Sequence, residues 1–125
     1  MTKNLDKEGL SSIVDNYQLF YVDLWGVVHN GVSLHHEAIK VLKEISKKRK
    51  DYILLTNAPR PNNTVKSFLE KLGMEKEIRD HVFTSGEVAL IYLKKNLINK
   101  TFFHVGPPRD FDLFKDFEKM KLDNI

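Results

Sequence analysis

An aspartate and a Thr-Asn pair follow two apolar runs, and these residues are the best suited to chemistry. Asp23 follows the run Leu19–Val22. Thr56 and Asn57 follow the run Tyr52–Leu55. In an open parallel sheet, ligands bind outside the carboxyl ends of the strands, so we expect these three side chains to share one crevice. The alternative is that Asp23 caps a turn and that Thr56 and Asn57 only begin a loop.

These residue types suit covalent phosphoryl transfer. A carboxylate can attack a phosphorus atom, while Thr56, Asn57 and backbone N–H groups near Gly26 hold the phosphate oxygens. Asp23 is then both nucleophile and metal ligand. Mg²⁺ takes one or two carboxylates in a near-octahedral shell of oxygens, so Asp23 alone supplies too few protein ligands. Asp110 and Asp112 follow a proline turn, and we expect them to begin a helix rather than to bind the metal.

Length and composition restrict the class of protein. The 125 residues have room for one compact domain or part of a larger one, and 42% of them are hydrophobic. No apolar run reaches the roughly 20 residues of a membrane-spanning helix, and Met1–Asp6 lacks the hydrophobic stretch of a signal peptide. We therefore expect a cytoplasmic protein without a membrane partner. Without cysteine, any metal must bind through oxygen or imidazole.

The net charge of +3 comes mostly from lysines, which cluster in Lys40–Lys50 and again in Lys94–Lys100. A basic balance can indicate nucleic acid, but single-strand readers add exposed aromatic platforms, and here most aromatic residues lie within apolar runs. We interpret the lysines as solvated helix faces and expect no nucleic-acid partner.

Apolar runs alternate with segments of helical period, which predicts β-α units and a parallel sheet in an α/β fold. Pro61 is placed to open one helix and Gly73 to end it, while Thr84 or Ser85 can cap the next. The predicted strands are Leu19–Val22, Tyr52–Leu55, Val82–Phe83 and Phe102–Val105. The predicted helical stripes are Ala38, Val41, Leu42, Ile45; Val65, Phe68, Leu69, Leu72; Val88, Ile91, Tyr92, Lys95; and, before the first strand, Leu10, Ile13, Val14, Tyr17.

Phenylalanines near the C-terminal end lack an evident partner. Phe111, Phe114 and Phe117 follow the turn Gly106–Asp110 at mixed helical spacing. They either pack back on the sheet or belong to an element whose continuation is missing. We expect them to be mobile or buried against a second molecule, so that the chain self-associates.

Three histidines near the first apolar run invite an acid-base interpretation, because imidazole titrates near neutral pH. His35 and His36 stand at a predicted helix start, where neighbours point apart. We expect only His29 to approach a ligand.

Four motifs in order make the chain similar to the haloacid dehalogenase superfamily, and within it to class IIA phosphatases of the NagD and 4-nitrophenylphosphatase type. Val22–Gly31 resembles the first motif and its flap, and Leu54–Arg60 resembles the second. Phe83–Glu87 resembles the segment before the cap, and His104–Asp110 is similar to a stretch of a subgroup that favours Asp-x-Trp-Gly-Val.

The resemblance implies a magnesium-dependent phosphohydrolase with an aspartyl-phosphate on Asp23, acting on a small phosphorylated metabolite. It also implies that the Trp25 backbone carbonyl is a metal ligand. Trp25 replaces the usual second aspartate, the general acid and base, and indole cannot transfer protons near neutral pH. The resemblance covers the first half of a partial Rossmann-like core (1–100) and a last strand with the start of a cap (101–125).

The family's lysine and later acids follow the cap, so we expect the chain to end before them and to be a poor enzyme alone. Activity then needs a complementing C-terminal half. The alternative is a non-catalytic remnant that binds or self-associates. A nucleotide-binding module is disfavoured because no glycine-rich phosphate loop follows the first strand.

Overall fold

A three-stranded parallel sheet forms the centre of the computed structural model, which describes residues 4–123 apart from the side chains of Phe111 and Asp112. The strands β1 (Leu19–Asp23), β2 (Asp51–Thr56) and β3 (Val82–Thr84) lie in that order. All pairs are parallel, which confirms the predicted α/β class. Their carboxyl ends therefore meet at one edge of the sheet.

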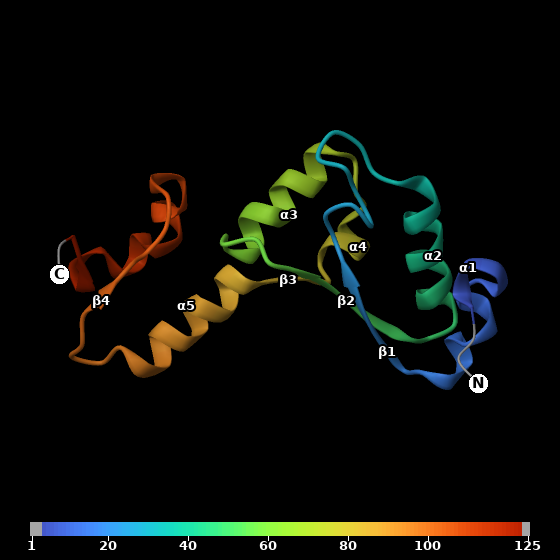
Figure 1. Cartoon of the computed structure of the whole chain (residues 1–125), viewed down its shortest axis with the longest axis horizontal. Coiled ribbons are helices and arrows are strands. Elements are labelled where there is room, and N and C mark those ends of the chain that lie inside the picture. The colour runs from blue at the N-terminus through green and yellow to red at the C-terminus, as the bar shows by residue number, and fades with distance from the viewer. Residues whose placement is uncertain (1–3, 124–125) are drawn as a thin grey trace.

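One face of the sheet is covered by α2 (His36–Lys47), α3 (Asn62–Lys71) and α4 (Lys76–Arg79), as Figure 1 shows. Fully burying a leucine side chain contributes about 2 kcal/mol, so this face supplies most of the stability of the sheet. The most deeply buried apolar residues are Leu24, Val28, Leu42, Leu54 and Leu69.

The predicted start and stop signals act as expected. Pro61 is the N-terminal cap of α3, and Gly73 follows the helix with φ +87°, a conformation that glycine adopts without strain. The helix α5 (Ser85–Asn96) begins after Thr84, whose side chain accepts a hydrogen bond from the Glu87 N–H.

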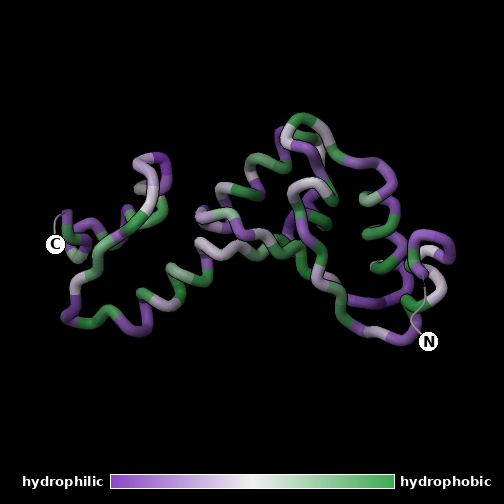
Figure 2. Tube along the Cα trace, viewed as in Figure 1, coloured by the Kyte–Doolittle hydropathy of each residue, from purple (hydrophilic) through white to green (hydrophobic). Residues whose placement is uncertain are grey.

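The other face of the sheet is open over β1 and β2. Leu19, Tyr21 and Leu55 point to this face and are 42%, 68% and 43% exposed. In the described residues, β1 is an edge strand with β2 as its single neighbour. Figure 2 shows that hydrophobic residues continue through the strands of the sheet and appear again along β4 (Phe102–Phe103).

A smaller unit follows α5. Phe102–Val105 was predicted as a further strand of the main sheet, and this was wrong: β4 pairs in parallel with β5 (Lys121–Leu122) in a separate two-stranded sheet. The 12 residues of α5 carry the chain away from the main sheet (Figure 1). β4 therefore pairs with β5, which lies nearer than the main sheet. The two strands are connected through the 3₁₀ helix η3 (Pro108–Met120).

Two phenylalanines of η3, Phe114 and Phe117, are buried within the chain. Phe114 and Phe117 are 7% and 8% exposed, and the Phe114 ring lies 5.1 Å from that of Phe102. The expectation that these two residues need a second molecule was wrong, because both are already buried within the chain. The side chain of Phe111 lies outside the described part.

The segment before β1 forms short turns instead of the one amphipathic helix that we predicted. It contains α1 (Leu5–Glu8), η1 (Leu10–Ser12) and η2 (Val14–Asn16). Gly9, with φ +69°, separates α1 from η1 and ends helical propagation. The apolar stripe still packs, since Val14 is buried in the core. In residues 4–123, no helix is both long and apolar enough to cross a membrane.

Candidate active site at the carboxyl edge of the sheet

A crevice of about 610 Å³ opens at the carboxyl ends of the strands. Asp23 stands opposite Leu55 in the parallel register, and Thr56 and Asn57 are the next residues along β2 and its loop. The structure therefore brings Asp23, Thr56 and Asn57 together. The lining residues are Tyr21, Asp23, Leu55, Thr56, Asn57, Ser85 and Val88.

Asp23 is exposed, and the backbone of the next residue orients its carboxylate. Its Oδ1 accepts a hydrogen bond of 2.9 Å from the Leu24 N–H. Thr56 is nearly buried, and its Oγ1 accepts a longer bond of 3.3 Å from the Ala58 N–H. A solvated carboxylate next to a hydroxyl and an amide is chemically able to attack and hold a phosphoryl group.

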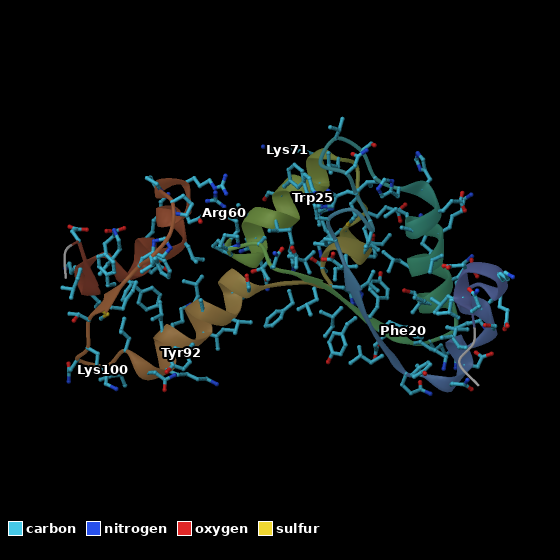
Figure 3. All side chains as sticks on the ribbon, in the orientation of Figure 1. Phe20, Trp25, Arg60, Lys71, Tyr92 and Lys100 are labelled. Atoms are coloured by element: carbon cyan, nitrogen blue, oxygen red, sulfur yellow. The ribbon has the colours of Figure 1, made fainter. Side chains whose placement is uncertain are left out.

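Trp25 and Gly26 belong to the flap, residues 24–35, and not to the lining of the crevice. The Gly26 N–H donates to the His29 carbonyl at 2.8 Å, and Gly26 has φ +77°. Trp25, labelled in Figure 3, is 64% exposed. Its ring lies close to Gly31, where an added Cβ would be 2.6 Å from the ring. The indole therefore shapes the flap.

His29 is buried inside the flap. Its Nδ1 accepts a hydrogen bond of 3.0 Å from the Gly31 N–H, and its ring packs against those of Trp25 and Phe68. Burial lowers the pKa of His29 below its ordinary value, and the nearby His35 lowers the pKa further, while Asp23 opposes the shift. The imidazole is thus neutral at neutral pH and fixes the turn. His35 caps α2 and His36 begins it, as predicted.

Ser85 lines the crevice, and sequence reasoning assigned it only a capping role. Its hydroxyl donates to the Ala58 carbonyl at 3.0 Å. Tyr21 was likewise counted only as part of an apolar run. Its exposure follows from strand alternation, which places Tyr21 on the same face as Asp23, two residues away.

Among the residues that line the crevice, Asp23 is the single acid. Among the described side chains, which exclude that of Asp112, no three His, Cys, Asp or Glu residues form a group that could hold a metal ion. Asp110, which the sequence assigned to a helix start, lies in the first turn of η3 and pairs with Arg60 at 3.6 Å. The single carboxylate of Asp23 leaves most positions around an ion unfilled.

A family model described as haloacid dehalogenase-like hydrolase matches residues 20–118. The chain belongs to this family. A haloacid dehalogenase-like hydrolase from Brucella suis 1330 has a similar structure, with 32% identity and a TM-score of 0.70 over 85% of this chain and 38% of that one. No curated protein matched the chain in sequence.

Two further solved structures, less similar in sequence, share the fold. A 4-nitrophenylphosphatase from Thermotoga maritima has 22% identity and a TM-score of 0.63, over 85% of this chain and 41% of that one. A glycerol phosphate phosphatase from Mycobacterium tuberculosis, solved in complex with magnesium, has 24% identity and a TM-score of 0.60, over 83% of this chain and 31% of that one. The chain thus spans about two fifths or less of the length of these relatives.

Proposed function

We propose that this chain carries the nucleophile and part of the phosphate-binding site of a haloacid dehalogenase-type phosphohydrolase that acts on a small phosphorylated metabolite. Asp23 attacks the phosphorus atom and forms an aspartyl-phosphate, while Thr56 and Asn57 hold the phosphate oxygens. The observation that carries the proposal is the single crevice lined by Asp23, Thr56 and Asn57. The N–H of Gly26 already donates to the His29 carbonyl. Gly26 therefore contributes by shaping the flap and not by holding a phosphate oxygen.

The isolated chain is expected to be a poor catalyst. The phosphate's charge must be neutralised and the leaving oxygen must receive a proton, and Trp25 transfers none. Loss of a single stabilising donor can cost about 100-fold to 1000-fold in turnover. We propose that the polypeptide corresponding to the rest of the longer relatives supplies the lysine and acids, with residues 1–100 as the first part of the core and 101–125 as the start of the cap.

Magnesium belongs to this proposal only in the completed protein. Asp23 and the Trp25 backbone carbonyl are its candidate ligands in this chain. Since these two groups leave the coordination mostly to water, we expect at most weak magnesium binding by the isolated chain.

A second function, a non-catalytic module that binds or self-associates, is favoured by a different observation. Leu19, Tyr21 and Leu55 leave an apolar sheet face uncovered next to the edge strand β1. Both functions require another polypeptide to cover this sheet face, but only the phosphohydrolase requires Asp23.

The test is a chimera in which this chain replaces the matched part of the Thermotoga maritima 4-nitrophenylphosphatase. The folded chimera should hydrolyse 4-nitrophenyl phosphate in magnesium buffer, whereas this chain alone should show no hydrolysis above background. Asp23→Asn should lower turnover by at least about 1000-fold. The exposed Asp6→Asn is the matched control and should leave turnover unchanged. A chimera that folds but has no activity, or that keeps it in Asp23→Asn, contradicts the phosphohydrolase.

A further inference from the structure

The loop that follows β2 is bound along its length by the segment that begins α5. The carbonyl of Ala58 accepts hydrogen bonds from the Gly86 N–H at 3.2 Å and from the Ser85 hydroxyl at 3.0 Å. The carbonyl of Arg60 accepts one from the Thr84 hydroxyl at 2.5 Å. These contacts join residues 24 to 28 positions apart in sequence, so they are tertiary contacts.

Asn62 and Glu87 close the far end of the same interface. The Asn62 side chain accepts a bond of 2.9 Å from the Thr84 N–H, and the Asn62 N–H donates a bond of 2.9 Å to the Glu87 carboxylate. Glu87 therefore links the first turn of α5 to the first turn of α3. A hydrogen bond to a charged acceptor contributes more than a neutral one, so Glu87 is the strongest single anchor of the loop.

Gly86 lets the two segments approach this closely. A Cβ at position 86 would lie 2.4 Å from both the N and the O of Arg60. Real Cβ atoms do not approach backbone atoms to this distance, so any side chain at position 86 must displace the loop.

The loop itself is stiff between these anchors. Both carbonyls that the α5 segment holds, those of Ala58 and Arg60, precede prolines, namely Pro59 and Pro61. Proline fixes its own φ and disfavours helical backbone in the residue before it. Few backbone torsions remain free, so the position of the anchors determines where Asn57 lies.

We propose that Thr84, Gly86 and Glu87 are positioning residues that hold loop 57–61 so that Asn57 faces Asp23 across the crevice. This inference rests on the proposed phosphate site. Thr84 and Glu87 also cap α5, but a cap needs no contact with the β2 loop, whereas Thr84 Oγ1 serves both the cap and the Arg60 carbonyl.

The test compares Glu87→Ala, Glu87→Gln and Gly86→Ala in the whole 125-residue chain. Glu37→Ala is the matched control, because Glu37 is an exposed acid in the first turn of another 12-residue helix. Amide hydrogen exchange and chemical shifts are measured first without ligand. Glu87→Ala should speed exchange of the Asn62 amide about tenfold and shift the amides of loop 57–62, with β1 and α2 unchanged. Glu87→Gln keeps an acceptor oxygen, so its exchange rate and chemical shifts should stay close to those of the unmodified chain.

The second readout is a titration with inorganic phosphate, followed at the side-chain amide of Asn57. The Asn57 response should weaken several-fold in Glu87→Ala and in Gly86→Ala, and should stay close to that of the unmodified chain in Glu87→Gln and Glu37→Ala. Unchanged loop shifts and exchange in Glu87→Ala would overturn the positioning role, and so would an unchanged Asn57 response. If the unmodified chain shows no phosphate response, the phosphate site fails, and the ligand-free measurement alone decides the positioning role.

Discussion

At the residue scale, the buried imidazole of His29 makes the flap sensitive to pH. Because burial holds its pKa below the ordinary value of about 6.5, the unfolded state binds more protons as the pH falls below that value. The free energy of unfolding should therefore fall with pH below about 6.5, until the pH reaches the folded pKa. His29→Asn keeps an acceptor for the Gly31 N–H and should lose much of this dependence.

Urea titrations at several pH values measure the effect, with the exposed His36→Asn as control. His36→Asn should keep the pH dependence of the unmodified chain. Equal pH dependence in His29→Asn and the unmodified chain would show that another group is responsible.

Trp25 stands where the resemblance expects a general acid and base, and its indole cannot transfer protons near neutral pH. In the chimera with the Thermotoga maritima enzyme, Trp25→Asp introduces a group that can transfer protons. Since general acid-base catalysis contributes about 100-fold or more, turnover of 4-nitrophenyl phosphate should rise. Trp25→Phe is the control and should not raise it. A chimera in which both variants have equal turnover would mean that the proton comes from elsewhere.

At the scale of elements, the flap depends on the close approach of Gly31 to the Trp25 ring. Gly31→Ala combines a positive φ of +90° with a contact of 2.6 Å, so it should destabilise the chain more than Gly73→Ala. Gly73 has a similar φ of +87° and no atom within 4 Å, so its substitution should cost only the backbone strain of about 1–2 kcal/mol. Chemical denaturation of Gly31→Ala, with and without Trp25→Ala, measures the contact. An equal cost for both glycines would contradict the clash.

The elements themselves were predictable where local signals were strong. The helical spacing of apolar residues, together with Pro61, Gly73 and Thr84, predicted α2, α3 and α5, and short apolar runs predicted β1 and β2. The partner of β4 was not predictable, because strands of two residues contain too little pattern to select one. The contacts of Gly86 with Arg60 were also missed, because only the tertiary fold brings these segments together.

At the scale of the whole molecule, the open sheet face is the feature that we expect to govern association. Tyr21 is 68% exposed between Leu19 and Asp23 on the edge strand β1. Uncovered apolar surface and a free strand edge both favour pairing with another chain. We expect concentration-dependent self-association that Tyr21→Lys weakens. The exposed Val32→Lys in the flap is the control and should not weaken it. Sedimentation equilibrium that finds a monomer at high concentration would contradict this expectation.

The central claim, that Asp23 is the nucleophile, is tested most directly by trapping the covalent intermediate. The chimera is quenched during turnover of 4-nitrophenyl phosphate and treated with borohydride, which reduces an aspartyl-phosphate to homoserine. Mass spectrometry should find homoserine at position 23, only when substrate is present and never in Asp23→Asn. Sustained turnover without any modification of residue 23 would contradict the account.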